Sequence, residues 1–317
     1  MVPARPDALV IGAGVIGLST GIRLAEAGLR VRIVAESPPE HTTSAAASAV
    51  VGPTFAPPGD RMRDWERATV EELAPRSADG SAGVHLTTGQ LVARGADQRP
   101  PFLDDLPGVR LCRADELPPG FGFGFWLRLP LVDMPRYLAH LRSRFAASGG
   151  EIELRRISSL RAAAGEAPLV ANCAGIGARD LVPDPSVIAV RGQHVIVENP
   201  GLDTFFLEAP LGPAWAGWFP HGAHVVLGGT ATEGDDNLTP DPGMAAEIVR
   251  RCAEVEPRLR TARVIGHRVG LRPARPTVRL EAQEIDGTRV VHNYGHGGVG
   301  VTLSWGCARD AVMMLLA

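Results

Sequence analysis

The sequence contains no lysine, because all 32 of its basic residues are arginine. Enzymes that anchor pyridoxal phosphate need a lysine for the Schiff base, so that class of enzyme is excluded. The four cysteines are scattered and form no C-x-x-C pair. We therefore expect neither a disulfide framework nor a zinc site, and we expect no other metal centre.

Long apolar runs are also lacking, and no stretch approaches the roughly 18 apolar residues that a membrane span requires. The first residues show no basic segment followed by a cleavage site, so we expect a cytoplasmic protein. A net charge of −3 and a pI near 6.3 argue against a nucleic-acid partner. The 317 residues suffice for one large domain or two closely joined ones.

The first forty residues have the pattern of a βαβ unit. A short apolar run at residues 8–11 predicts a buried strand, and residues 18–27 have apolar positions at helical spacing. Gly28 ends that helix, and residues 31–34 predict a second strand. The turn between the first strand and the helix fits G-x-G-x-x-G, with the residues Gly12, Ala13, Gly14, Val15, Ile16 and Gly17.

This glycine turn predicts dinucleotide binding. The first glycine permits the tight turn, the second lets the backbone approach a pyrophosphate, and the third allows the helix to pack closely on the strand. The free N–H groups of the helix N-terminus then face the phosphates. Glu36 ends the second strand about twenty residues on, where an acidic side chain binds ribose hydroxyls.

A second glycine-rich turn near the C-terminus favours FAD over NAD. Residues 289–293 predict a strand, residues 295–300 carry four glycines, and residues 301–316 predict a helix. Such a density of glycine lets the backbone pass close to a flat ligand. The positive end of the helix behind it suits a flavin, whose ring system takes on negative charge when reduced.

Between these ends the pattern is mixed and then β-rich. We expect helices at residues 61–73, 135–147 and 244–255, with Asp133 capping the second of them. Strands are expected at residues 86–92, 123–129, 151–155, 169–173, 193–198 and 224–228. Nucleotide-fold segments at both ends of a β-rich middle indicate an α/β protein with two interleaved domains.

Several blocks, in order along the chain, resemble the D-amino-acid oxidase family of FAD enzymes. The most specific are RPARP at residues 272–276 and NYGHGG at residues 293–298, and the resemblance covers nearly the whole chain. It implies a Rossmann-like FAD-binding domain interleaved with a β-rich α+β substrate domain. We assign residues 1–55, 130–182 and 266–317 to the first domain and residues 56–129 and 183–265 to the second.

The resemblance also implies a role for individual residues. Arg272 would pair with a substrate carboxylate through its planar guanidinium, and the Gly298 carbonyl would face the substrate amine. Thr42, Thr43 and Ser44 would lie along the pyrophosphate and ribose, and Thr302 at the flavin edge. The remaining cofactor contacts implied are Ile157, Cys173, Ala174 and Gly175 near the adenosine, and Gly297, Gly298, Val299, Gly300 and Val301 near the flavin.

The sequence departs from the family in its tyrosines. Family members place tyrosines over the substrate, whereas this chain has only Tyr137 and Tyr294, neither of which is expected to act as a substrate lid. Trp215, Trp218 and His221 could supply an aromatic wall and a donor instead, or the tryptophans could be core packing. If they form the wall, small D-amino acids should be poor substrates.

These observations predict an FAD-dependent oxidase that converts a D-amino acid or related amine to an imine and then an oxo acid, with dioxygen as acceptor and hydrogen peroxide as product. The FAD is expected to be bound non-covalently, and the cofactor carries the chemistry. Two alternatives stay open: an oxidase of a secondary amine or specialised biosynthetic intermediate, and a flavin-binding protein without turnover. The sequence leaves the substrate side chain undetermined, and a homodimer stays open.

Overall fold

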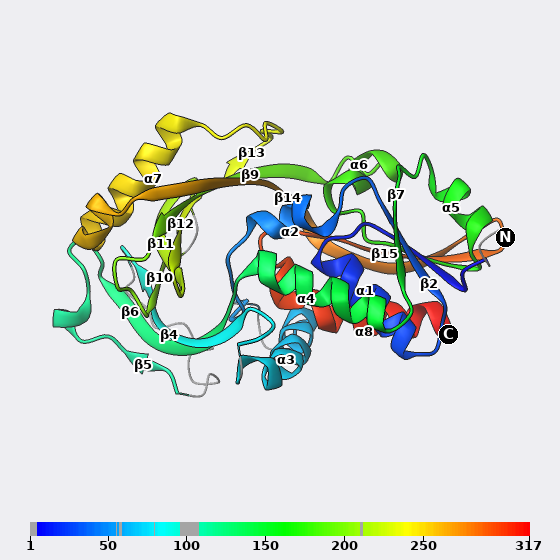
Figure 1. Cartoon of the computed structure of the whole chain (residues 1–317), viewed down its shortest axis with the longest axis horizontal. Coiled ribbons are helices and arrows are strands. Elements are labelled where there is room, and N and C mark those ends of the chain that lie inside the picture. Colours follow the sequence, from blue (N-terminus) through cyan, green and yellow to red (C-terminus); the bar gives the residue numbers. More distant parts are fainter. Residues whose placement is uncertain (1–4, 55, 57–58, 79, 96–107, 210–211) are drawn as a thin grey trace.

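The computed structural model describes residues 5–317 apart from 55, 57–58, 79, 96–107 and 210–211. Figure 1 shows an elongated molecule with a helix-rich part at one end, where both termini lie, and a β-rich part at the other. The strands of the described residues form one 15-stranded mixed sheet that runs through both parts. This architecture confirms the predicted α/β fold class.

The helix-rich part is built on the predicted βαβ unit. Strand β1 (Ala8–Ile11) leads into α1 (Val15–Glu26) and β2 (Val31–Ala35), and β1 lies parallel to β2 and to β8 (Leu169–Asn172). Strand β8 in turn pairs in parallel with β15 (Thr288–His296). Parallel pairing places the carboxyl ends of these strands at one edge of the sheet, where the glycine turns are.

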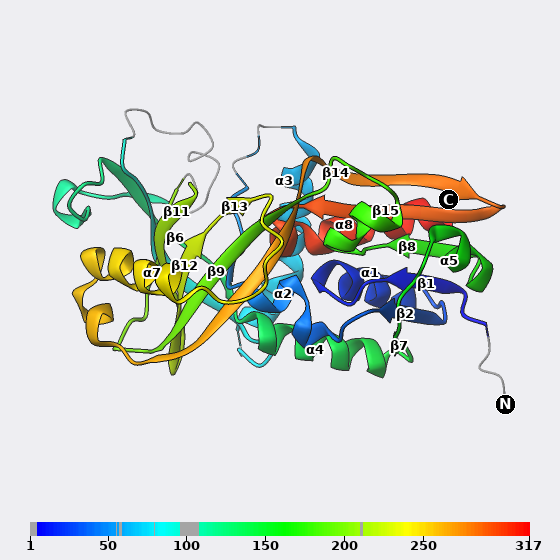
Figure 2. The ribbon, with the colours of Figure 1, turned by 90° about the horizontal axis from the view of Figure 1, so that it is seen from above.

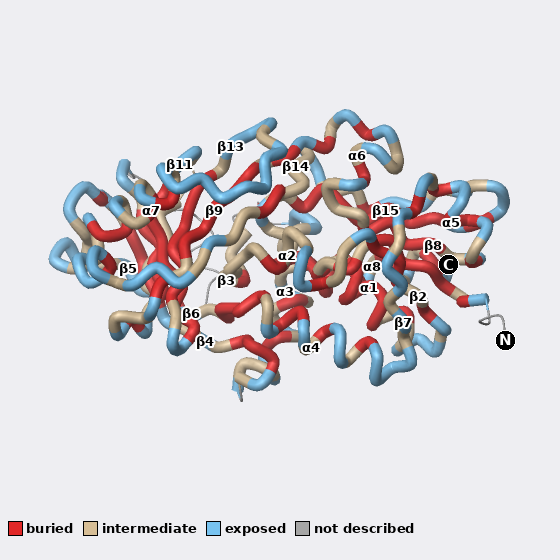
Figure 3. Tube along the Cα trace, turned by 45° about the horizontal axis from the view of Figure 1, so that its top comes forward, coloured by how far each residue is buried: buried red, intermediate tan, exposed pale blue. Residues whose placement is uncertain are grey.

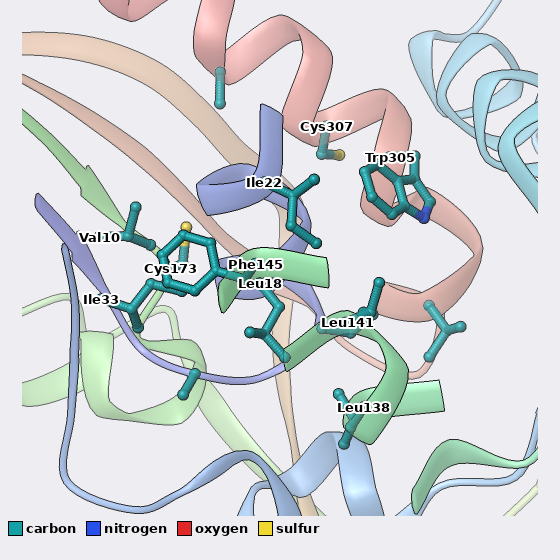
Figure 4. Close-up of a cluster of buried hydrophobic side chains, with 14 of the residues drawn as sticks. Val10, Leu18, Ile22, Ile33, Leu138, Leu141, Phe145, Cys173, Trp305 and Cys307 are labelled. Carbon is teal, nitrogen blue, oxygen red and sulfur yellow. The ribbon is translucent and has the colours of Figure 1, made fainter. Parts of the chain in front are cut away.

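Three long helices pack against one face of these strands. Helices α1, α4 (Met134–Ala147) and α8 (Gly300–Leu316) enclose a continuous hydrophobic core. Figure 4 shows Leu18 and Ile22 of α1, Phe145 of α4 and Trp305 of α8 within it. The Trp305 indole N–H donates to the Tyr137 hydroxyl at 2.8 Å, so Tyr137 is a core residue.

The β-rich part has a core on each side of its sheet. Strands β9 (Ile188–Glu198), β11 (Ala214–His221) and β12 (His224–Thr230) are antiparallel neighbours, and α7 (Pro242–Val255) covers one of their faces. Strands β4 (Val84–Ala93), β6 (Phe123–Val132) and β10 (Phe205–Glu208) continue the sheet. Figure 3 shows buried backbone along both parts of the molecule.

Strand β14 (Val264–Ile285) connects the two parts and was not predicted (Figure 2). It pairs with β9 as far as Ala274, and with β15 at Ala274 and again from Arg279, with a shift of register between these two residues. Pro276 lies in that irregular segment, where no ladder hydrogen bond is lost. The predicted domain boundary at residues 265/266 falls inside β14, and the one at 55/56 adjoins residue 55, which is outside the described residues; the domain limits stay a prediction.

The remaining elements complete the two parts. Helix α3 (Arg61–Leu73) has the predicted bounds, and α4 begins after Asp133 as expected. The predicted cap by the Asp133 side chain is wrong, because that side chain makes no capping hydrogen bond. The other elements are α2 (Thr43–Ala46), α5 (Leu160–Glu166), α6 (Ala178–Leu181), β3 (Ala49–Val50), β5 (Arg110–Leu111), β7 (Glu151–Leu154) and β13 (Thr232–Glu233). No helix among the described residues has the length and apolarity to cross a membrane.

Candidate functional site

An elongated cavity of about 660 Å³ runs from the carboxyl ends of β1, β2 and β8 to β9 and β14. Most of the residues predicted as site residues line it, although they come from segments far apart in the sequence. These are Gly12, Ala13, Gly14, Val15, Ile16, Glu36, Thr42, Thr43, Ser44, Ile157, Cys173, Ala174, Gly175, Arg272, Gly297, Gly298, Gly300 and Val301. Five others are not part of its wall: Gly17, Val299, Thr302, Trp215 and Trp218.

The first glycine turn has the close contacts that its spacing predicts. Gly12 has a φ of +103°, and a Cβ there would lie 2.4 Å from the Cys173 carbonyl oxygen. A Cβ at Gly17 would lie 1.9 Å from the Gly12 carbonyl oxygen, so Gly17 lets α1 pack on the turn. Gly14 lies open to the cavity beside Ser44, whose hydroxyl accepts the Val15 N–H at 3.0 Å. The turn and the N-terminus of α1 can therefore hold a pyrophosphate.

The far end of the cavity brings together the residues predicted to contact an adenosine. Glu36 follows β2, is largely exposed and forms an ion pair with Arg156 at 3.1 Å. Its carboxylate is free to accept from ribose hydroxyls on its remaining oxygen. Ile157, Ala174 and Gly175 line the same region. The Cys173 thiol is buried, and burial raises its pKa to about 12, so it stays protonated.

The C-terminal glycine turn lies at the opposite end. Gly297 has a φ of +54°, and Gly298 and Gly300 line the cavity where α8 begins. Thr302 lies one turn into α8, where its hydroxyl accepts the Gly52 N–H at 3.4 Å. The structure thus brings the backbone of the turn to the cavity, but it does not bring the Thr302 side chain there.

Arg272 is a guanidinium without a carboxylate partner among the described residues. It projects from β14 onto the backbone of Gly192 on β9, where a Cβ would lie 2.3 Å from its Nη1. Nη1 donates to the Thr230 carbonyl at 3.0 Å. Burial lowers its pKa, but an arginine remains charged at any working pH. A half-buried guanidinium in a cavity wall, with no carboxylate partner among the described residues, is suited to bind a carboxylate through two parallel hydrogen bonds.

Three histidines in the cavity wall were not predicted as site residues: His41, which is exposed, and the buried His194 and His296. His194 lies on β9 two residues after Gly192, and His296 lies in the C-terminal glycine turn, between Gly295 and Gly297. Burial lowers the pKa of each to about 4, and the charge of Arg272 contributes at His194. Both rings are therefore neutral near pH 7. The alternation of β9, with Gly192 and His194 on one face, is the signal that could have identified His194.

The two candidate tryptophans lie on opposite faces of β11. The Trp218 ring stacks on Phe206 with centroids 4.4 Å apart and belongs to the core under α7, which fits the core-packing interpretation. The Trp215 ring lies on the other face, above the glycines of β11 and β12: a Cβ at Gly217, Gly228 or Gly229 would be within 2.7 Å of it. The Trp215 and His194 rings pack edge-to-face with their centroids 6.2 Å apart. Trp215 therefore lies behind His194 and is not itself part of the cavity wall.

Tyr294, which was not expected to cover the substrate, and His221, which was considered as a donor, can be assessed from the same contacts. Tyr294 lines the cavity, but its hydroxyl donates to Asp184 at 2.8 Å, so it is held within the wall. His221 accepts from or donates to the Ser48 hydroxyl at 2.7 Å and does not line the cavity. The described part of the chain holds no group of three or more His, Cys, Asp or Glu side chains that could bind a metal ion.

Comparisons with known proteins show what this chain is similar to. The family model described as FAD dependent oxidoreductase matches residues 7–314. A D-amino-acid oxidase of Rubrobacter xylanophilus is 49% identical, with 97% of this chain and 95% of the relative covered. A D-amino-acid oxidase of Streptomyces coelicolor is 45% identical (97% and 96% covered), and a human D-aspartate oxidase is 36% identical (96% and 93% covered).

Solved structures show the same fold at low sequence identity. A glycine oxidase from Geobacillus kaustophilus superposes with a TM-score of 0.83 at 20% identity, with 98% of this chain and 95% of that chain covered. An L-alpha-glycerophosphate oxidase from Mycoplasma pneumoniae, solved with FAD bound, gives a TM-score of 0.79 at 18% identity (98% and 95% covered).

Proposed function

The chain belongs to the FAD dependent oxidoreductase family, and on that premise we propose that it is an oxidase of D-amino acids. FAD is its cofactor, and the residues that line the cavity suit it: the turn that begins at Gly12 would hold the pyrophosphate, Glu36 the ribose, and the Gly297–Gly300 turn the flavin. The observation that carries the substrate class is Arg272, a half-buried guanidinium whose remaining donors have no acidic partner among the described residues. A substrate carboxylate completes that site.

The residues around the cavity bind and orient the substrate. Arg272 fixes the carboxylate, and the Gly298 backbone lies beside it, since a Cβ at Gly298 would be 3.6 Å from the Arg272 Cδ. We propose that the Gly298 carbonyl accepts a hydrogen bond from the amine. Together with the face of the flavin, these two contacts would make the three points that hold the Cα–H in one orientation, which favours the reaction entropically and selects one enantiomer.

The balanced reaction removes two electrons and two protons from the amino acid. FAD supplies the acceptor for the hydride that leaves Cα, while the nitrogen loses a proton and the C=N bond of the imine forms. Water then hydrolyses the imine to a 2-oxo acid and ammonia. Dioxygen is proposed to take the two electrons and two protons as hydrogen peroxide. The positive end of α8 lies at the cavity and favours negative charge on the cofactor.

A panel of D- and L-amino acids and secondary amines tests this proposal. The FAD-loaded protein should release equal amounts of hydrogen peroxide and 2-oxo acid with D-amino acids and none with their L-enantiomers. Turnover with secondary amines alone would support the alternative substrate class. If no amine yields peroxide or reduces the bound flavin, the protein is a flavin-binding protein without turnover.

A further inference from the structure

His194 lies next to the carboxylate site, on the same face of the same sheet. The Arg272 guanidinium rests on Gly192, and His194 is two residues farther along β9. Residues two apart on a strand point to the same face about 7 Å from each other. Both Arg272 and His194 line the cavity. A charged donor and an imidazole are therefore neighbours in one wall.

The hydrogen bond to Ala46 fixes the orientation of the imidazole. The Nδ1 atom lies 3.0 Å from the Ala46 carbonyl oxygen, which can only accept, so Nδ1 carries a hydrogen and donates it. In the neutral ring Nε2 is then an acceptor. The edge of the Trp215 indole supports the ring from behind, with the planes at 80°. The ring is held by Ala46 and Trp215 together.

The surroundings of His194 also keep the ring neutral. It is buried, and the charges of Arg272 and Arg268 add to the effect of burial, so its pKa is lowered to about 4. An imidazolium would repel a substrate ammonium, whereas a neutral ring offers it a lone pair. Arg272 and His194 thus present a donor fork and an acceptor from the same wall of the cavity.

We propose that the His194 Nε2 accepts a hydrogen bond from the α-amino group of the substrate whose carboxylate is bound by Arg272. This inference rests on the proposed function and deepens it, because it makes recognition of the amine depend on a side chain. An ammonium has three N–H donors, so it can donate to the Gly298 carbonyl and to His194 at the same time. A secondary amine with two N–H donors in its protonated form satisfies both acceptors as well.

His194→Phe removes the acceptor and keeps an aromatic ring against Trp215, whereas His194→Gln keeps an acceptor oxygen. We expect His194→Phe to raise the KM for D-amino acids by about ten- to hundredfold, the usual cost of a lost hydrogen bond to a charged group. The Kd for benzoate, a carboxylate without an amine, should stay unchanged, as should the Kd for FAD. Both constants are measured by titration of the visible flavin spectrum. His194→Gln should recover most of the lost affinity.

His221→Phe is the matched control, because His221 is a buried histidine outside the cavity wall. It should leave the ratio of amino-acid to benzoate affinity unchanged. An unchanged KM in His194→Phe, or an equal loss for benzoate and amino acid, would overturn the inference. Turnover by the wild type separates a failure of the proposed function from a failure of this inference. If the wild type oxidises no D-amino acid, the proposed function fails. If the wild type oxidises D-amino acids and His194→Phe has the same KM, only the role of His194 fails.

Discussion

Arg272 is the residue on which substrate recognition depends most in this account. Arg272→Lys keeps one positive charge but loses the planar fork. We expect FAD affinity to be unchanged and kcat/KM for D-amino acids to fall by the equivalent of about 2–5 kcal/mol. Steady-state kinetics and flavin titration measure both quantities. Arg268→Lys is the control: Arg268 lies four residues earlier on the same face of β14, outside the cavity wall.

An Arg272→Lys enzyme with wild-type kcat/KM would show that the carboxylate binds elsewhere. A loss of both FAD affinity and activity would instead show that Arg272 contacts the cofactor. The first result contradicts the proposed substrate contact directly, because no other residue has been given that role.

The two tryptophans of β11 form a matched pair of positions for testing what shapes the substrate pocket. Trp215→Phe leaves space above Gly217, Gly228 and Gly229, next to His194, so we expect the ranking of D-amino acids to shift toward larger side chains. Trp218→Phe alters the core under α7 and should lower stability without changing the ranking. Relative kcat/KM over a panel from D-alanine to large D-amino acids measures the difference. An unchanged ranking in both variants would make both tryptophans purely structural.

The predicted elements that proved accurate are those with strong local signals. The glycine turn between β1 and α1 is specified by steric rules that act within a few residues, so the cavity-lining positions of Gly12 and Gly14 could be expected from spacing alone. Strand β14 could not be predicted from the sequence, because its prolines and charged residues are tolerated in a strand only through its pairing with β9 and β15. The proximity of Arg272 to Gly192 and His194 likewise depends on the register between two strands about 80 residues apart.

Gly17→Ala tests the packing of α1 on its turn. The added Cβ would lie 1.9 Å from the Gly12 carbonyl oxygen, so the turn must move away from the position in which it faces the pyrophosphate. We expect a lower Tm and a sharply weaker FAD affinity. Gly165→Ala in α5 is the control: a Cβ there meets nothing within 4 Å, and alanine favours a helix, so its Tm should be unchanged or higher. Wild-type FAD binding in Gly17→Ala would contradict the close contact.

Buried histidines set the acid stability of the whole molecule. The pKa values of His194, His292 and His296 are lowered to about 4, and that of His221 to about 3, in each case chiefly by burial. An unfolded chain binds protons on these side chains near pH 6.5, where the native protein does not. Stability is therefore highest above pH 6.5 and falls as the pH drops from there toward 4.

A series of Tm values at constant FAD concentration between pH 7.5 and 5 checks this prediction. Four such groups should give a falling Tm across the series, with each histidine contributing up to about 1.4 kcal/mol per pH unit. His292→Gln, which can keep a hydrogen bond to Asn172 or Gln283, should flatten the dependence. A Tm that stays constant to pH 5 in the wild type would show that these rings are protonated in the native state.

The central claim, that this chain orients a D-amino acid against its own FAD, is tested most directly without oxygen. The FAD-loaded protein is mixed anaerobically with the D- and L-enantiomers of the same amino acids, and the visible flavin absorbance is followed. The account predicts rapid bleaching with D-enantiomers, none with L-enantiomers, and slow bleaching in Arg272→Lys. Flavin that stays oxidised with every D-amino acid, or that bleaches equally with both enantiomers, would contradict it.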